Sequence, residues 1–179
     1  GMCYAILGAL KLPLTGRLKM DEAKVGGLIS SFGIMVGPII LLAGFLTDTM
    51  GRKGVWIAGA LMVAASLLLL SRTRQYKFAV VAVLLLSAGW AAMINVANAL
   101  MYMAYDNVFM ATNLLDFFFG LGAFLTPAAV VWLLRKKGFT TGVSILGGIA
   151  VIPVIMSLGV EMEAAGGAGE SPGFASLFK

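Results

Sequence analysis

Residues 44–54 read Gly-Phe-Leu-Thr-Asp-Thr-Met-Gly-Arg-Lys-Gly and separate two long apolar runs. Three charges fall within six residues here, although only 12% of the chain is charged. Gly51 permits a sharp reversal of the backbone. Asp48 comes just before it, where a carboxylate can face the positive N-terminal end of another helix. The residues alone favour an ordinary polar turn between two helices, with Arg52 and Lys53 reaching the lipid headgroups.

The composition of the whole chain indicates a membrane protein. The 179 residues are 60% hydrophobic, and the mean hydropathy is +0.99. A soluble domain has about 45–50% apolar and about 25% charged residues, so lipid is the solvent here. The net charge of +5 is scattered over short turns without a basic face. We therefore expect no nucleic-acid partner, and we expect contact with anionic headgroups.

The chemistry-bearing residues are few. The chain has no histidine, and Cys3 is its single cysteine. This excludes histidine–cysteine zinc sites, cysteine–histidine nucleophilic pairs and disulfides. Asp116 is the one carboxylate inside an apolar span. We expect no metal, no cofactor and no enzymatic activity.

The apolar runs predict an all-α, polytopic membrane helical bundle with one partial and five full spans. Residues 2–14 are too short to cross, which is typical of a truncated first helix. A ~30 Å core needs about 18 or more apolar residues, and the full spans are 25–47, 54–71, 78–102, 113–134 and 141–160. A sheet is not expected, because lipid demands internally paired backbone groups. Residues 161–179 are rich in glycine, glutamate and serine and predict a flexible linker.

Two segments 89 residues apart indicate an internal repeat. Residues 33–38 and 122–127 both read small-xxx-small-Pro. Each is followed by a basic turn and a helix that opens on a glycine, Gly54 or Gly138. Three helices per copy is an odd number, so the two three-helix repeats must be inverted, as in many secondary transporters. The glycines expected to make packing contacts that let helices slide are Gly33, Gly37, Gly120 and Gly122.

The turn at 44–53 resembles the signature Gly-x-Leu-x-Asp-x-x-Gly-Arg-Lys between helices 2 and 3 of the major facilitator superfamily. The matching residues are Gly44, Leu46, Asp48, Gly51, Arg52 and Lys53. The resemblance implies the N-terminal six-helix domain of a multi-pass transporter in the cell (inner) membrane. Such a protein moves a small solute by alternating access, together with a C-terminal six-helix half that is not part of this chain.

The same resemblance implies a gating role for the signature turn. In the family, its Asp and Arg form charge interactions that hold one conformation at the cytoplasmic face. Asp106, the acid at the end of the fourth span, is the natural partner of Arg52. A non-transporting membrane scaffold or receptor derived from a transporter is the alternative function.

Residues 89–127 more loosely resemble helices 4 and 5 of fucose-permease-like sugar transporters. The shared elements are an Ala/Asn run ending at Asn98, then Asn113-Leu114 and Gly122-Ala123. This implies a sugar or similar polar metabolite as the substrate, with proton symport or another coupling ion. The helix 1 and helix 4 carboxylates of that group are replaced here by Ala9 and Ile94, so proton coupling and the substrate stay open.

Five polar or aromatic residues inside spans 4 and 5 are candidate substrate ligands. Asn95 and Asn98 share one helix face and either bind sugar hydroxyls or form interhelical hydrogen bonds. Trp90 is placed to stack on a sugar ring. Asp116 is either a proton carrier or ligand or, as we favour, an acid in the first helical turn capped by Asn113.

Two features of charge leave alternatives open. Lys11, in the partial first span, either binds an anionic substrate or, as we favour, snorkels to the nearby interface. The turns on the two sides of the membrane carry nine and two cations, with the signature turn on the poorer side. The positive-inside rule would place that turn outside, whereas the family resemblance places it in the cytoplasm.

Overall fold

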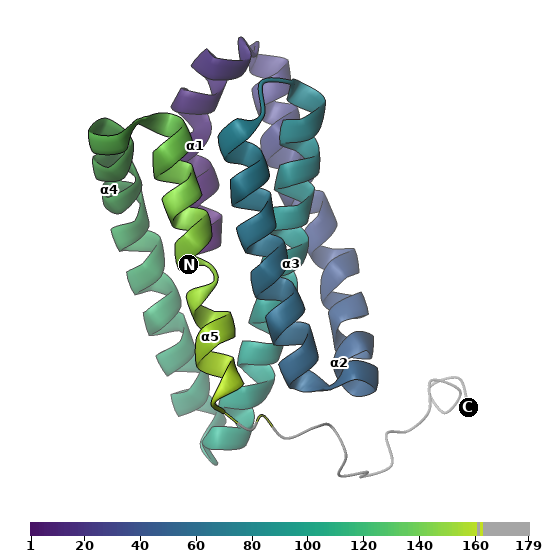
Figure 1. Cartoon of the computed structure of the whole chain (residues 1–179). Coiled ribbons are helices and arrows are strands. Elements are labelled where there is room, and N and C mark those ends of the chain that lie inside the picture. The colour runs from purple at the N-terminus through teal and green to yellow at the C-terminus, as the bar shows by residue number, and fades with distance from the viewer. Residues whose placement is uncertain (161, 163–179) are drawn as a thin grey trace.

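The computed structural model describes residues 1–160 and 162, and all regular structure in this part of the chain is helical. The helices are α1 (Met2–Leu18), α2 (Glu22–Arg72), α3 (Tyr76–Ala104), α4 (Val108–Ile149) and α5 (Ile152–Leu158) (Figure 1). Within the described residues, three helical stretches are long and apolar enough to cross a membrane: Glu22–Arg72, Tyr76–Ala104 and Val108–Leu158. The predicted all-α membrane bundle is confirmed. The predicted linker at 161–179 lies, apart from Met162, outside the described residues.

Helices α2 and α4 each double back at a glycine (Figure 1). Gly51 has φ 79° and ψ 156°, and Gly138 has φ 76° and ψ 169°. Such positive φ values cost little only for glycine, which has no Cβ. Each long helix therefore consists of two arms, at 22–50 and 52–72 in α2 and at 108–137 and 139–149 in α4. The reversal expected at Gly51 is present.

The two reversals lie at opposite ends of the bundle: that of α2 at the lower end in Figure 1, that of α4 at the upper end. The unit of α1 and α2 thus runs opposite to the unit of α3 and α4, as an inverted repeat requires. One detail of the predicted repeat is wrong. The glycine that shares the conformation of Gly138 is Gly51, not Gly54, because the chain reverses where φ is positive.

Helices α2 and α3 approach each other closely at Gly59 and Gly89. A Cβ added to Gly59 would lie 2.9 Å from the Gly89 carbonyl oxygen, and one added to Gly89 would lie 2.5 Å from the Gly59 carbonyl oxygen. Nearby, the Ser66 hydroxyl donates to the Ala82 carbonyl at 2.7 Å. Glycines and hydroxyls that let helices approach and bond are the usual adhesive of membrane bundles.

The glycines that the sequence singled out for packing behave differently from one another. Gly122 packs against the start of α1, where its Cβ position lies 3.4 Å from the Met2 nitrogen. The Cβ positions of Gly33, Gly37 and Gly120 meet nothing within 4 Å. As packing contacts within the described chain these three predictions are wrong, because the glycines lie on outward faces of α2 and α4.

The start of α4 also differs from the prediction. The Asn107 side chain accepts hydrogen bonds from the backbone N–H groups of Phe109 (3.0 Å) and Met110 (3.2 Å), which makes Asn107 the N-cap. The predicted cap, Asn113, lies inside the helix instead. Asn107 directly precedes the apolar start of α4, which is the usual place of an N-cap. The predicted span begins only at residue 113, so the prediction makes the preceding turn too long.

Candidate functional site

The signature turn is spread over the two arms of α2. Asp48 is exposed on the first arm, three residues before the reversal at Gly51. Arg52 and Lys53 follow the reversal and are half-buried, while Gly44 is half-buried one turn before Asp48. The turn therefore presents its acid outward and turns its cations toward the bundle.

Lys53 ties the signature turn to the end of α5. Its Nζ donates to the carbonyl oxygens of Val160 at 3.1 Å and Leu158 at 3.5 Å. The last carbonyls of a helix lack partners within it, and they form its negative end. A lysine ammonium at this position satisfies them. The sequence indicated no partner for Lys53, since more than 100 residues separate the two groups.

Asp106 lies exposed in the connection between α3 and α4. That connection is at the lower end of the bundle, as is the reversal in α2 (Figure 1). Among the described residues, the ion pair that the structure shows is Lys24–Asp21, at 3.6 Å. The pair of Arg52 with Asp106 stays a prediction.

Trp90, at the middle of α3, belongs to an aromatic cluster formed by three helices. Its ring centroid is 5.7 Å from that of Phe32 in α2 and 6.4 Å from that of Tyr4 in α1. Tyr4 and Phe32 are 5.9 Å apart and nearly perpendicular, at 71°. Phe32 is buried, whereas 62% of Tyr4 is exposed. Aromatic rings in this range attract one another, so the cluster, Tyr4, Phe32 and Trp90, presents a fixed aromatic surface with one open side.

Two amide side chains of α3 are without a partner in the described part of the chain. Asn95 and Asn98 are partly exposed, and neither side chain forms a hydrogen bond within residues 1–160 and 162. The interhelical hydrogen bonds considered for them are therefore absent from the described structure. Each amide keeps two donors and an acceptor available.

Asn113 and Asp116 are exposed on the first arm of α4. Because α4 starts at Val108, Asp116 lies more than two turns inside, and its interpretation as an acid in the first turn is wrong. Asn113 borders an open cavity of about 520 Å³ together with Asn107, Phe109, Met110, Leu114 and Phe117. The structure does not bring Asp116 into that cavity lining.

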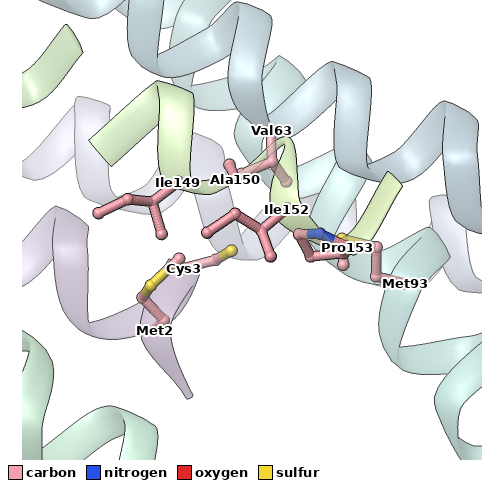
Figure 2. Close-up of a pocket in the computed structure, with 8 residues that line it drawn as sticks. All are labelled: Met2, Cys3, Val63, Met93, Ile149, Ala150, Ile152 and Pro153. Atoms are coloured by element: carbon pink, nitrogen blue, oxygen red, sulfur yellow. The ribbon is translucent and has the colours of Figure 1, made fainter. Parts of the chain in front are cut away.

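A more enclosed, apolar cavity of about 230 Å³ lies beside the start of α1 (Figure 2). It is lined by Met2, Cys3, Val63, Met93, Ile149, Ala150, Ile152 and Pro153. A second cavity of about 230 Å³ adjoins it, with Trp56, Trp90 and Ile94 in its wall. Polar ligands need several fixed hydrogen-bonding groups, and the first cavity offers at most a thiol. No group of three or more acidic or cysteine side chains in the described residues is arranged to hold a metal ion.

Arg17 is a residue that the sequence pattern did not single out. Its Nε donates to the Thr73 carbonyl at 3.2 Å and its Nη2 to the Ser71 carbonyl at 3.3 Å, at the end of α2. Its Nη1 donates to the Thr140 hydroxyl at 3.3 Å, and the guanidinium lies 4.8 Å from the Phe139 ring centroid. One cation thus joins α1, α2 and α4 at the upper end of the bundle.

Comparison with known families agrees with this arrangement. The sequence model of the family Major Facilitator Superfamily matches residues 1–176, which include helices α1 to α5 and both glycine reversals. No curated protein and no solved structure matches the chain.

Proposed function

Because this chain belongs to the major facilitator superfamily, whose members are transporters rather than enzymes, we propose that it forms the N-terminal half of a secondary transporter for a sugar or similar polar solute. A C-terminal half completes the cavity in this proposal, and the two halves rock about a site near the bilayer midplane. On the basis of its family, we assign this integral membrane protein to the cell (inner) membrane.

The observation that carries the sugar proposal is the pair of unpartnered amides on α3. A polar side chain inside a span is costly unless it is paired. Asn95 and Asn98 lie within about 12 Å of Trp90 along the helix, at 1.5 Å rise per residue. Amide donors and acceptors match sugar hydroxyls, and an aromatic surface matches the apolar face of a sugar ring. Asn113 and Asp116, which are exposed on α4, border the cavity that the C-terminal half completes in this proposal.

Coupling and gating are assigned to charged residues. Asp116 is the carboxylate available to carry a coupling proton, since Ala9 and Ile94 cannot titrate. At the lower end, Asp48, Arg52 and Asp106 hold one conformation closed in this proposal, and Gly51 lets the chain reverse there. The attachment of Lys53 to α5 supports this role, because it makes the signature turn move together with the last helix. The Cβ position of Gly44, in the same turn, meets nothing within 4 Å, so Gly44 makes no close helix contact within the described residues.

Uptake by the full-length protein in liposomes tests the substrate. Asn98→Ala and Asn95→Ala should each raise KM for the transported sugar roughly three- to tenfold, the effect of one lost hydrogen bond. Gln75→Ala is the matched control, because Gln75 is an exposed amide outside the spans. If no sugar in a broad panel is taken up, a non-transporting scaffold or receptor is favoured instead. The mostly apolar cavities beside α1 agree with that alternative.

Charge reversal tests the gate. Asp106→Lys should abolish uptake, and the exchange Arg52→Asp with Asp106→Arg should restore part of it. Glu22→Lys, an exposed acid at the other end of the bundle, should leave uptake unchanged. Normal uptake in Asp106→Lys would remove Asp106 from the gate.

A further inference from the structure

One outward face of α1 carries Tyr4, Gly8 and Lys11. The spacings of four and three residues place them above one another on a helix, and all three are exposed. The opposite side of the helix is the buried stripe of Cys3, Ile6, Leu7, Leu10 and Leu14. The face is therefore presented away from the packed core.

Lys11 is unusual among the cations of the described residues. It is the one that lies more than a turn from a helix end or a reversal, seven residues or about 10 Å before Leu18. Its ammonium has no hydrogen-bonding or ionic partner in the described residues, where the salt bridge is that of Lys24 with Asp21. An unpaired ammonium at this depth is costly unless it faces water or an anion.

The carboxylate inside a span does not neutralise Lys11. Gly122 of α4 lies beside Met2, and α1 and the first arm of α4 run in the same direction (Figure 1). Lys11 is nine residues beyond Met2, whereas Asp116 is six residues before Gly122. The two groups are thus about 22 Å apart along the bundle.

Helix geometry directs the Lys11 side chain along α1 toward Tyr4 rather than toward the nearer helix end. Side chains of an α-helix lean toward its N-terminus, so Lys11 leans toward Tyr4 and away from the nearer end at Leu18. Snorkelling to that end would oppose this lean. Tyr4, on the same side of α1, contacts Phe32 and Trp90, so the N-terminal end of this face meets α2 and α3.

Gly8 leaves space between the cation and the aromatic cluster. A Cβ added to Gly8 would meet nothing within 4 Å. The face thus consists of a free ammonium, a bare backbone surface and an aromatic surface, in that order along α1.

We infer that this Tyr4–Gly8–Lys11 face binds a ring-bearing organic monoanion of the sugar-acid class. The carboxylate accepts hydrogen bonds from Lys11 Nζ, the ring lies over Gly8, and its apolar face rests on Tyr4 and Trp90. The inference rests on the proposed transport function and deepens it, because it adds a negative charge to the substrate.

Equilibrium binding to the purified full-length protein tests the charge. Radiolabelled glucuronate and glucose are the probes, since they share a ring and differ at the carboxylate. Lys11→Gln should weaken glucuronate binding on the order of tenfold or more, as loss of a charged hydrogen bond does. Lys11→Arg should retain it within about threefold, and glucose binding should not change in either variant.

Steric variants test the place of the ring. Gly8→Leu should abolish glucuronate binding, because its side chain fills the space over which the ring lies. Gly16→Leu is the matched control on the same helix, since the Cβ position of Gly16 also meets nothing within 4 Å. Binding that survives Gly8→Leu, or that Lys11→Gln leaves unchanged, overturns the inference.

Transport by the same protein separates the two proposals. Uptake of glucose without uptake or binding of glucuronate leaves the transport proposal intact and overturns the sugar-acid site. Lys11-dependent binding of glucuronate without uptake of any solute supports the site and removes the transport proposal.

Discussion

At the scale of single residues, Arg17 and Asp21 show what polar side chains do at the upper end of the bundle. The Arg17 guanidinium reaches two carbonyls at the end of α2 and a hydroxyl in α4. Asp21 caps α2 by accepting a hydrogen bond from the Lys24 amide at 2.8 Å. Both residues satisfy backbone groups that a helix end leaves unpaired.

Replacing Arg17 should destabilise the protein. Arg17→Ala leaves the Ser71 and Thr73 carbonyls without these donors, and charged hydrogen bonds contribute about 1.5–3 kcal/mol, so we expect a loss of about 2 kcal/mol. Arg17→Lys should recover only part of it, because an ammonium lacks the planar fork. Thermal unfolding in detergent measures the loss. Arg72→Ala, an exposed cation at the same end, is the control; equal loss in both variants would contradict the role of Arg17.

The cap at Asp21 should depend on pH. The hydrogen bond from the Lys24 amide lowers the pKa of Asp21 below its usual value. A lowered pKa in the folded state means that the stabilisation is present at neutral pH and is lost as pH falls through that pKa. The protection factors of the first amides of α2, which compare the measured hydrogen exchange with the intrinsic rate at the same pH, should therefore fall on acidification. In Asp21→Asn, which caps without titrating, this pH dependence should disappear.

At the scale of helices, the crossing of α2 and α3 depends on two glycines. Gly59 and Gly89 meet backbone to backbone, so neither position has room for a methyl group. Gly33 and Gly120 lie on open faces of α2 and α4. Glycine in a helix is unfavourable by roughly 1 kcal/mol relative to alanine. The close crossing of α2 and α3 explains why Gly59 and Gly89 are glycines despite this cost.

The same substitution should have opposite effects at the two kinds of glycine. Gly89→Ala should destabilise the protein by about 1–3 kcal/mol, because its Cβ would overlap the Gly59 carbonyl. Gly120→Ala should be neutral or slightly stabilising. Thermal unfolding of both variants in one detergent measures the difference. A stable Gly89→Ala protein would show that the helices separate at little cost.

At the scale of the whole molecule, the distribution of charge conflicts with the family topology. The upper end carries nine lysines and arginines, while the turn at the lower end carries Arg52 and Lys53. The positive-inside rule alone would place the upper end in the cytoplasm. Arg17 weakens that count, because its charge is used inside the bundle.

Cysteine labelling in intact cells should place the signature turn in the cytoplasm. Thr49→Cys should react with an impermeant maleimide only after permeabilisation, and Gln75→Cys should react without it. Both residues are exposed, whereas the neighbouring Thr73 is buried and unsuitable. The native Cys3 is buried, so its background labelling should be low. The reverse pattern would invert the topology.

Local patterns predicted much of the fold and less of the site. Apolar length predicted helices, and glycine beside charge predicted the reversal at Gly51, because both depend on neighbouring residues. The predicted helix cap at Asn113 is wrong because both Asn107 and Asn113 lie near the polar turn, and the local sequence does not show at which of them the helix begins. The aromatic cluster was predicted only at Trp90, since Tyr4 and Phe32 come from other helices.

The sequence by itself determined that this is an all-helical membrane protein of the major facilitator superfamily, because composition, run length and motif spacing are local properties. Only the tertiary structure decided which groups meet. It brought Lys53 to the end of α5, Arg17 to α2 and α4, and Gly59 to Gly89. It also left Lys11 and the two amides of α3 without hydrogen-bonding partners among the residues that the structure describes. The physical reason is that pairing across helices depends on how they pack in three dimensions, which no short stretch of sequence encodes.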